Sequence, residues 1–189
     1  MPKIVDHEQY RKELLSKCFD LFAEKGYGAL TMREIAQSLN VSTGTLYHYF
    51  ASKQALFEQL VEEISQQDLT SALAEIKPGL SLVETMKAVG KYLAKNEDYF
   101  IKQAYIWVEF CQHQEQENIR NSPVFQRVNH IYQQAICNFF GVEDPVLVSF
   151  VLSFFNGLII SKLWGDENID YCEQCVLLGK MLTQYLQVN

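Results

Sequence analysis

Residues 31–50 read TMREIAQSLNVSTGTLYHYF, and this stretch predicts two short helices joined by a tight polar break. Thr31 and Glu34 form an S/T-x-x-E capping box, in which each side chain satisfies a free backbone N–H at the start of the first helix. Asn40 can adopt the left-handed conformation that ends this helix. Ser42 is a favourable N-cap for the helix that follows. The pattern therefore predicts a helix-turn-helix.

The second helix of this pair has a polar outer face and an apolar inner face. Leu46 and Phe50 lie where they can anchor the helix from behind. The outer face has small or hydrogen-bonding side chains: Thr43, Thr45, Tyr47 and His48. A helix with such a face is suited to lie against a polar surface. In a helix-turn-helix that surface is the major groove of DNA.

The whole chain of 189 residues is long enough for one or two domains with a well-filled core. Its 48% hydrophobic and 13% aromatic residues exclude a disordered composition. Strand alternation is absent, and the few Gly and Pro residues fall at plausible helix ends. We therefore expect an all-α fold of about nine helices, over residues 8–25, 31 to about 39, 43–49, 53–76, 82–94, 97–116, 123–140, 145–164 and 169–187.

The net charge of −7 is unusual for a protein that binds DNA, but it is unevenly distributed. Residues 1–57 hold seven Lys or Arg and six Asp or Glu, whereas residues 58–189 hold nine and seventeen. The N-terminal part is therefore the only portion that is not acidic. Since net charge governs steering and non-specific affinity, the acidic remainder should weaken non-specific DNA binding. Base-edge contacts and dimerisation must then supply more of the specific affinity.

Residues 26–57, GYGALTMREIAQSLNVSTGTLYHYFASKQALF, resemble the N-terminal DNA-binding segment of TetR-type (tetracycline-repressor-like) transcriptional regulators. With the preceding helix included, the resemblance covers about a third of the chain. It is specific because capping, core and contact positions all occur at the right spacing. The matching positions are Gly26, Thr31, Ile35, Ala36, Val41, Ser42, Thr45, Leu46, Tyr47, Tyr49, Phe50, Lys53 and Leu56.

The resemblance implies a DNA-binding domain over residues 1–52, with its helix-turn-helix at about 31–50, and a helical effector-binding and dimerisation domain over 53–189. It implies DNA contacts by Thr31, Arg33, Ser42, Thr43, Gly44, Thr45, Tyr47, His48, Tyr49 and Lys53. Those at the tip of the recognition helix would approach base edges, and the tyrosines and the lysine would position phosphates. Five of them also have a plainer alternative, as core, helix-filling or ordinary surface residues: Thr45, Tyr47, His48, Tyr49 and Lys53.

The last two helices, at about 145–164 and 169–187, are expected to form the interface of a homodimer. The first is apolar nearly all round, and a helix that is hydrophobic on every side must be buried on every side. Its apolar stretch of 15 residues, 146–160, falls short of the roughly 20 that span a bilayer. We therefore expect a buried or partner-facing helix and no membrane. The resemblance implies a four-helix interface, and close helix approach would justify Gly157.

The middle of the chain is rich in aromatic residues, and the resemblance implies that it encloses an effector pocket. Ligand pockets are mostly apolar with a few polar groups, so we expect a small, largely apolar or aromatic effector. Most of these aromatics are nevertheless expected in the core. The candidate ligand residues are Trp107, Glu109, Phe110, His113, Asn129, His130, Gln133 and Asn156. Glu109 and His113 are compatible with a surface pair, a pocket pair or half a metal site, and neither metal nor cofactor is expected.

An enzyme is the rival class, and Cys172-x-x-Cys175 is its strongest feature. No second cysteine pair completes a zinc site, and no strand–helix–strand pattern indicates a redox motif. Five cysteines without a signal peptide indicate a cytoplasmic chain without a disulfide framework. The sequence therefore predicts a dimeric, cytoplasmic, ligand-responsive repressor that binds a palindromic DNA operator. A constitutive DNA-binding regulator without a ligand is the alternative.

Overall fold

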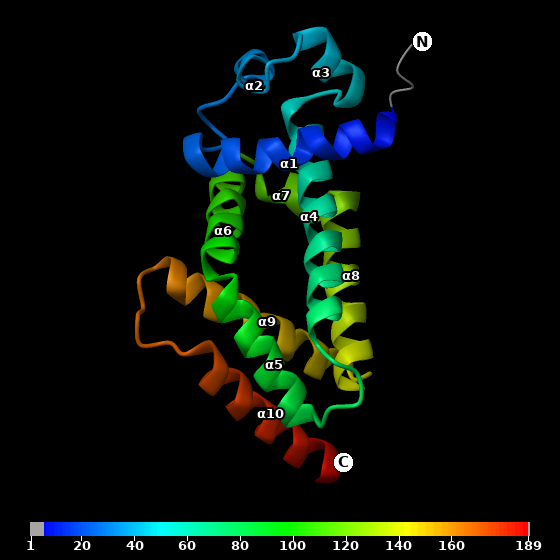
Figure 1. Ribbon diagram of the computed structural model, residues 1–189, viewed down its shortest axis with the longest axis vertical. Coiled ribbons are helices and arrows are strands. Elements are labelled where there is room, and N and C mark those ends of the chain that lie inside the picture. Colours follow the sequence, from blue (N-terminus) through cyan, green and yellow to red (C-terminus); the bar gives the residue numbers. More distant parts are fainter. Residues whose placement is uncertain (1–5, 189) are drawn as a thin grey trace. The chain divides into compact units, whose positions relative to one another are not determined.

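The computed structural model describes residues 6–188, and within that range the fold is all-α, as expected (Figure 1). Its helices are α1 (His7–Lys25), α2 (Met32–Ser38), α3 (Thr43–Tyr49), α4 (Lys53–Glu75), α5 (Leu82–Lys95), α6 (Glu97–Gln112), α7 (Gln116–Asn121), α8 (Pro123–Phe140), α9 (Pro145–Leu163) and α10 (Tyr171–Val188). Most boundaries lie within one or two residues of the expected ranges. The described chain thus has ten helices where about nine were expected.

The additional helix is α7, over residues 116–121, a segment that lay almost wholly between two expected helices; the helix expected over 97–116 ends earlier, at Gln112. His113 Nδ1 lies 2.8 Å from the carbonyl oxygen of Glu109, the acceptor that the amide of His113 would use in a continuing helix. The amide of His113 instead donates to Phe110 O at 3.0 Å. The side chain of His113 therefore occupies the helical acceptor, and the chain turns before α7 begins.

The described chain forms two compact units. The first contains the residues up to Gln66 together with Tyr105–Asn129, and the second contains Gln67–Ala104 together with the residues from His130 onward. Helices α4, α6 and α8 therefore contribute residues to both units. The described part of the expected DNA-binding range 1–52 lies in the first unit, whereas the expected range 53–189 is divided between the two; residues 1–5 and 189 lie outside the described part.

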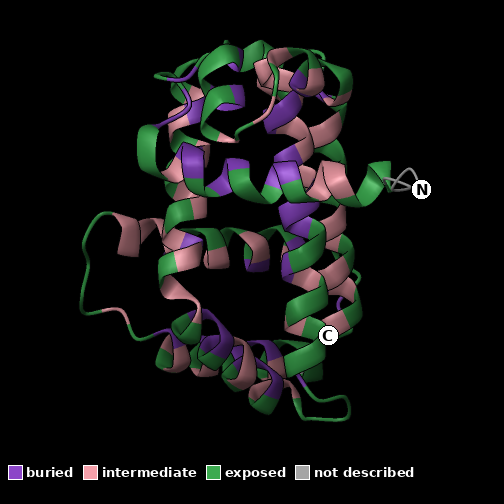
Figure 2. Ribbon diagram, turned by 45° about the horizontal axis from the view of Figure 1, so that its top comes forward, coloured by how far each residue is buried: buried purple, intermediate pink, exposed green. Residues whose placement is uncertain are grey.

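The core of the first unit is built around α1, whose buried residues follow the i, i+3, i+4 spacing of one helix face (Figure 2). Leu15, Cys18 and Phe22 are fully buried there. They share this core with fully buried residues of α2, of α3 and its C-cap, and of α4: Ile35, Leu46, Phe50, Leu56 and Phe57. Full burial of such a side chain stabilises the fold by about 1.5–3 kcal/mol. The short helices α2 and α3 therefore depend on this shared core.

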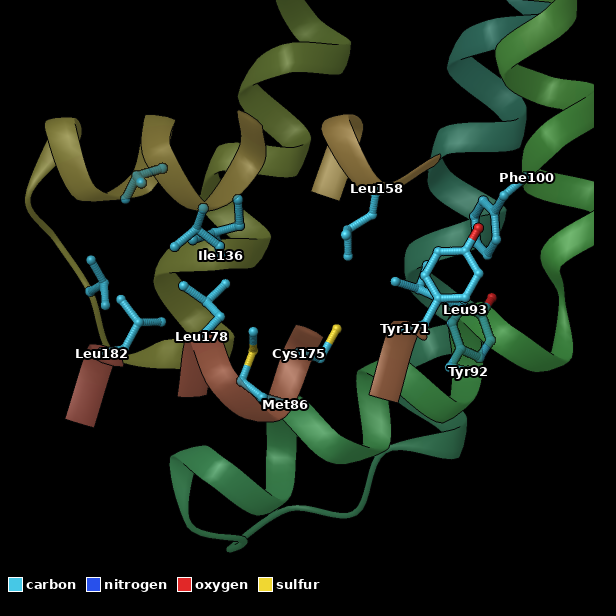
Figure 3. Packing of buried hydrophobic residues seen from close by; sticks show 13 residues of the cluster. Met86, Tyr92, Leu93, Phe100, Ile136, Leu158, Tyr171, Cys175, Leu178 and Leu182 are labelled. Atoms are coloured by element: carbon cyan, nitrogen blue, oxygen red, sulfur yellow. The ribbon is translucent and has the colours of Figure 1, made fainter. Parts of the chain in front are cut away.

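The core of the second unit contains the contact between α5 and α10, which cross closely. Figure 3 shows Met86 of α5 near Cys175 and Leu178 of α10, and all three are fully buried. Gly90 makes the close approach possible, since a Cβ there would stand 2.7 Å from the carbonyl oxygen of Tyr171. A Cβ on Gly179 of α10 would likewise stand 3.1 Å from the Cα of Val83 on α5. The position of α10 is thus set by glycines on both helices.

Helix α9 is apolar enough and long enough to cross a membrane by length and composition alone. Only 17% of its most apolar 18 residues are buried within this chain. Val146 is 77% exposed and Phe150 is 49% exposed. Residues 6–188 of one chain therefore do not meet the expectation of burial on every side, because one face of α9 has no neighbour among them.

Candidate nucleic-acid interface

Helix α2 begins with the capping box expected from the sequence. The backbone N–H and the hydroxyl of Thr31 both donate to Glu34 Oε2, at 2.8 and 2.7 Å, and the amide of Glu34 donates to Thr31 Oγ1 at 3.3 Å. The hydrogen bonds from Thr31 lower the pKa of the Glu34 carboxyl. Arg33 is exposed in the first turn of the same helix. The start of α2 is therefore fixed locally, with an exposed guanidinium beside it.

The turn between α2 and α3 adopts the expected left-handed conformation. Asn40 has a φ of 56°, and the amide of Val41 donates to Ala36 O at 2.9 Å. Ser42 then caps α3, because its Oγ accepts a hydrogen bond from the amide of Thr45 at 2.9 Å. The Oγ of Ser42 also lies 2.8 Å from Thr45 Oγ1. The turn and the cap together fix the direction of α3 relative to α2.

The outer face of α3 is exposed, while Leu46 and the following Phe50 are fully buried behind it. Tyr47 is 51% exposed, and His48 is also exposed. Thr43 and Thr45 are half-buried at the start of the helix. Gly44 is exposed, and no atom lies closer than 3.7 Å to the position of an added Cβ. The structure therefore brings the predicted recognition residues together on one helix with a smooth, polar outer face.

Tyr49 is half-buried at the end of α3 and is linked to the start of α1. Its hydroxyl lies 2.8 Å from His7 Nδ1, and its ring packs edge-on against His48, with 5.0 Å between ring centres. The ring of Tyr10 also packs against the ring of Tyr49. His7 could not be identified from the sequence, because it lies 42 residues from Tyr49 and no local pattern connects the two.

Lys53 begins α4 and directs its ammonium toward the loop between α1 and α2. Its Nζ donates to Tyr27 O at 2.9 Å and to Leu30 O at 2.8 Å, and it lies 4.1 Å from the centre of the Tyr27 ring. Partial burial lowers the pKa of Lys53, while the carboxylates of Glu109 and Glu34 oppose that shift. The ammonium therefore ties α4 to the loop that precedes α2.

Lys53→Met is expected to lower the free energy of unfolding by about 1–2 kcal/mol, because two loop carbonyls lose a charged donor. Chemical denaturation of the full chain measures this change. Lys17→Met is the matched control, since Lys17 is exposed on α1. If Lys53 acts mainly as a phosphate contact, its replacement instead leaves stability unchanged and lowers the salt dependence of DNA binding by about one unit of log–log slope.

Two of the expected effector residues, Glu109 and His113, lie against the same loop. Glu109 Oε2 accepts a hydrogen bond from the amide of Gly28 at 3.1 Å. The ring of His113 fills the space that a Cβ on Gly28 would occupy. His113 Nδ1 is 4.0 Å from Glu109 Oε2. The C-terminal end of α6 is therefore joined to the loop before α2 through a pair that the sequence could not distinguish from a ligand pair.

The other expected effector residues are distributed over both units. Phe110 is fully buried and stacks on Phe57 with 4.1 Å between ring centres, and half-buried Trp107 meets Phe125 edge-on at 4.7 Å. Exposed Asn129 belongs to the first unit, and His130, Gln133 and Asn156 belong to the second. The structure therefore does not gather the eight candidates within one unit, and it gives the two aromatic ones a packing role.

The cysteine pair of α10 lies in and beside the core of the second unit. Cys175 is fully buried, and burial raises its pKa to about 12. Cys172 is half-buried, and both thiols are free. Because the thiolate is the reactive form, a thiol with so high a pKa is a poor nucleophile at neutral pH. The surroundings of Cys175 are those of a packing residue.

Three comparisons with known proteins bear on this geometry. The family model for bacterial regulatory proteins of the tetR family matches residues 14–60. The probable acrEF/envCD operon repressor of Escherichia coli (strain K12) is 25% identical over 191 residues, which cover 93% of this chain and 86% of that protein. Both matches include the α2–turn–α3 segment. The relative is named as a probable operon repressor.

Solved structures show the same fold over nearly the whole chain. Salmonella enterica GusR aligns with a TM-score of 0.72 at 24% identity and covers 98% of this chain and 99% of its own. The regulator FadR from Bacillus subtilis, solved in complex with stearoyl-CoA, aligns with a TM-score of 0.69 at 16% identity, covering 90% and 96%. Residues 14–60 therefore match the tetR family of bacterial regulatory proteins, and the chain as a whole is similar in sequence to a repressor and in fold to solved regulators of transcription.

Proposed function

We propose that this protein is a homodimeric repressor that binds a palindromic operator and leaves it when a small molecule binds. The exposed polar face of α3, held by the Ser42 cap and by buried Leu46 and Phe50, carries the proposal. We propose repression rather than activation because a relative is named as a repressor. We expect the protein in the cytoplasm, where it meets chromosomal DNA, and we assign it no catalytic role.

In this proposal the first turn of α3 meets base edges. Gly44 lacks a side chain, so the helix can approach the groove floor closely. The hydroxyl of Thr45 is already hydrogen-bonded to Ser42, which leaves its methyl group to contact a thymine methyl. Exposed Tyr47 would position a phosphate through its hydroxyl, and His48 would reach a phosphate or a base. Thr31, Arg33, Thr43 and Tyr49 complete the proposed contact set, and Lys53 orients the loop before α2.

The dimer would form through the exposed faces of α9 and α10. Phe150 is about half exposed on α9, and Leu177 and Met181 are about half exposed one turn apart on α10. A Cβ on Gly157 would meet nothing within 4 Å among the residues that the structure describes. Gly within a helix costs about 1 kcal/mol relative to Ala. A partner helix that approaches closely at Gly157 would justify that cost and would cover the apolar face of α9.

An effector would act by binding the operator-competent and released geometries unequally. Helix α6 supports this part of the proposal, because it contributes residues to both units and carries Glu109 near its C-terminal end. Glu109 bonds the loop before α2, so a change in α6 would reach the DNA-binding segment. FadR, which has the same fold, was solved with stearoyl-CoA. A constitutive regulator is the alternative, and in it the released geometry would not exist.

Tyr47→Ala is expected to weaken binding to all DNA sequences alike, whereas Thr45→Ala should change which base is preferred at one position. The first change removes a phosphate contact and the second a base-edge contact. Mobility-shift assays at one fixed salt concentration measure both, since phosphate binding depends steeply on ionic strength. Gln37→Ala is a matched control on the exposed surface of α2. Unaltered DNA binding in both variants would show that the contact assignment is wrong.

Selection of bound sequences from a random DNA pool tests the proposed function as a whole. A dimer with two recognition helices about one DNA turn apart should enrich a palindrome with half-sites separated by roughly 34 Å. Enrichment of a single unrepeated half-site would argue against the dimeric mode. Enrichment of no sequence at all would overturn the proposed function.

A further inference from the structure

Asp68, on α4, is a buried carboxylate with only neutral hydrogen-bond donors around it. It is 7% exposed and accepts hydrogen bonds from Tyr99 Oη at 2.7 Å, Gln103 Nε2 at 2.8 Å and Tyr132 Oη at 3.5 Å. The donors come from α6 and α8, and all four residues belong to the second unit. Among residues 6–188, Asp68 forms no ion pair with Lys, Arg or His.

A carboxylate in this position is costly, because a buried charge without a counter-charge loses its hydration. Burial raises the pKa of Asp68, and the hydrogen bonds from Gln103, Tyr99 and Tyr132 oppose that shift. An asparagine would keep the same neighbours without the charge, since a tyrosine hydroxyl can accept as well as donate and the Gln103 amide can turn. The packing of the second unit therefore explains a polar residue at this position but not an acidic one.

The surroundings of Asp68 suit a positively charged group. The hydroxyl of Tyr92 donates to the backbone carbonyl of Asp68 at 3.4 Å, so tyrosines of α5, α6 and α8 surround the residue. Aromatic rings attract cations through their faces. Tyr99, Gln103 and Tyr132 are half-buried, so the residues that bond Asp68 reach the surface in part. The excess of acidic residues over 58–189 also raises the local concentration of cations.

We propose that Asp68, Tyr99, Gln103 and Tyr132 bind the cationic head of the effector, an ammonium or guanidinium group carried on an apolar or aromatic body. The inference rests on the proposed function, because it gives the chemical class of the ligand that the repressor answers to. The cationic head of the ligand supplies the counter-charge that Asp68 lacks among residues 6–188. Asp68 provides the charge, and the tyrosine rings and the Gln103 amide enclose the head group. An anionic head group is repelled from this site.

Titration calorimetry on the full chain at neutral pH tests the proposal with four probes that share one body. They are 4-phenylbutylammonium, 4-phenylbutylguanidinium, neutral 4-phenylbutan-1-ol and anionic 4-phenylbutyrate. At least one cation is expected to bind tenfold or more tightly than the alcohol, and the carboxylate is expected to bind weakest. Asp68→Asn should lower the affinity for the cation at least tenfold and leave that for the alcohol unchanged. Asp98→Asn, at an exposed acid of α6, is the matched control and should change neither.

The loss of cation affinity in Asp68→Asn is not expected to arise from unfolding. Since the pKa of Asp68 is raised in the folded state, its contribution to stability is fully present at acidic pH. It decreases as pH rises from the unfolded pKa toward the folded one. At neutral pH Asp68→Asn is therefore expected to unfold no more easily than the original chain, which a thermal melt checks. Equal cation affinity in Asp68→Asn and the original chain, or no binding of either cation, overturns the proposal.

The DNA selection described above separates this outcome from a failure of the proposed function. A chain that selects a palindrome but binds neither cation keeps its proposed function and loses only the assignment of the effector class. A chain that binds the cation through Asp68 but selects no DNA keeps the site and loses the repressor.

Discussion

Phe150→Glu is expected to weaken dimerisation about 100-fold or more and to reduce operator binding with it. The phenyl ring is 49% exposed in one chain, on the face of α9 that lacks a neighbour. In a two-fold interface the substitution places a carboxylate in both copies at once. Burial of an unpaired charge costs several kcal/mol, and 100-fold corresponds to about 2.7 kcal/mol. Analytical ultracentrifugation measures the dimer, and a mobility shift on the selected palindrome measures the consequence.

Leu73→Glu is the matched control for this result. Leu73 is 59% exposed on α4, so the substitution introduces the same charge in place of an exposed apolar residue outside α9 and α10. It should leave both dimer and operator binding unchanged. If Leu73→Glu dissociates the dimer while Phe150→Glu does not, the interface lies elsewhere. A thermal melt of both variants checks that neither effect arises from unfolding.

The helix-turn-helix could be predicted from the sequence because its determinants are local. The capping pair Thr31 and Glu34, the turn residue Asn40 and the cap Ser42 each act within a few residues. Their hydrogen bonds form as the sequence pattern indicates. The apolar positions of α1 follow a helical period, so its buried face could also be assigned. In this segment propensity, capping and burial all favour the same structure, which is what makes a fold predictable from sequence.

The roles of Lys53, Glu109 and His113 could not be predicted, because their partners are distant in the chain. The amide of Gly28 is 81 residues from Glu109. A lysine that begins a helix looks the same in sequence whether it binds phosphate or two loop carbonyls. His113 also ends α6, and that effect depends on a single side-chain hydrogen bond. The contacts of Lys53 and Glu109 are tertiary, which explains the ambiguity of the expected effector residues, whereas the bond of His113 is local but has no sequence pattern that announces it.

The cover of helix α9 and the burial of Asp68 are two other features that could not be predicted from the sequence. The apolar composition of α9 identified it as a helix in need of cover, but composition cannot say whether the cover comes from its own chain or from another. Asp68 lies in the polar run SQQDLTS, where nothing distinguishes it from a surface acid. Its hydrogen-bond donors on α6 and α8 come 31, 35 and 64 residues later in the chain. Only the folded chain reveals a charge without a counter-charge.

Gly90→Val is expected to lower the free energy of unfolding by about 3 kcal/mol or more. A Cβ at Gly90 would stand 2.7 Å from Tyr171 O and 2.8 Å from the Cα of Cys172. Overpacking a core commonly costs about 1–3 kcal/mol, and here the obstructing atoms belong to the backbone and cannot rotate away. Valine adds two further methyl groups to the same space. Chemical denaturation of the full chain measures the loss.

Gly44→Val is the control that separates this clash from the general effect of replacing a helical glycine. Nothing lies closer than 3.7 Å to an added Cβ at Gly44, so its replacement should not lower stability. Because α5 positions α10, and α10 carries Leu177 and Met181 on its exposed face, Gly90→Val should also weaken the dimer. If Gly90→Val is as stable as the original chain, the close crossing of α5 and α10 is wrong, and with it the position of that half of the proposed interface.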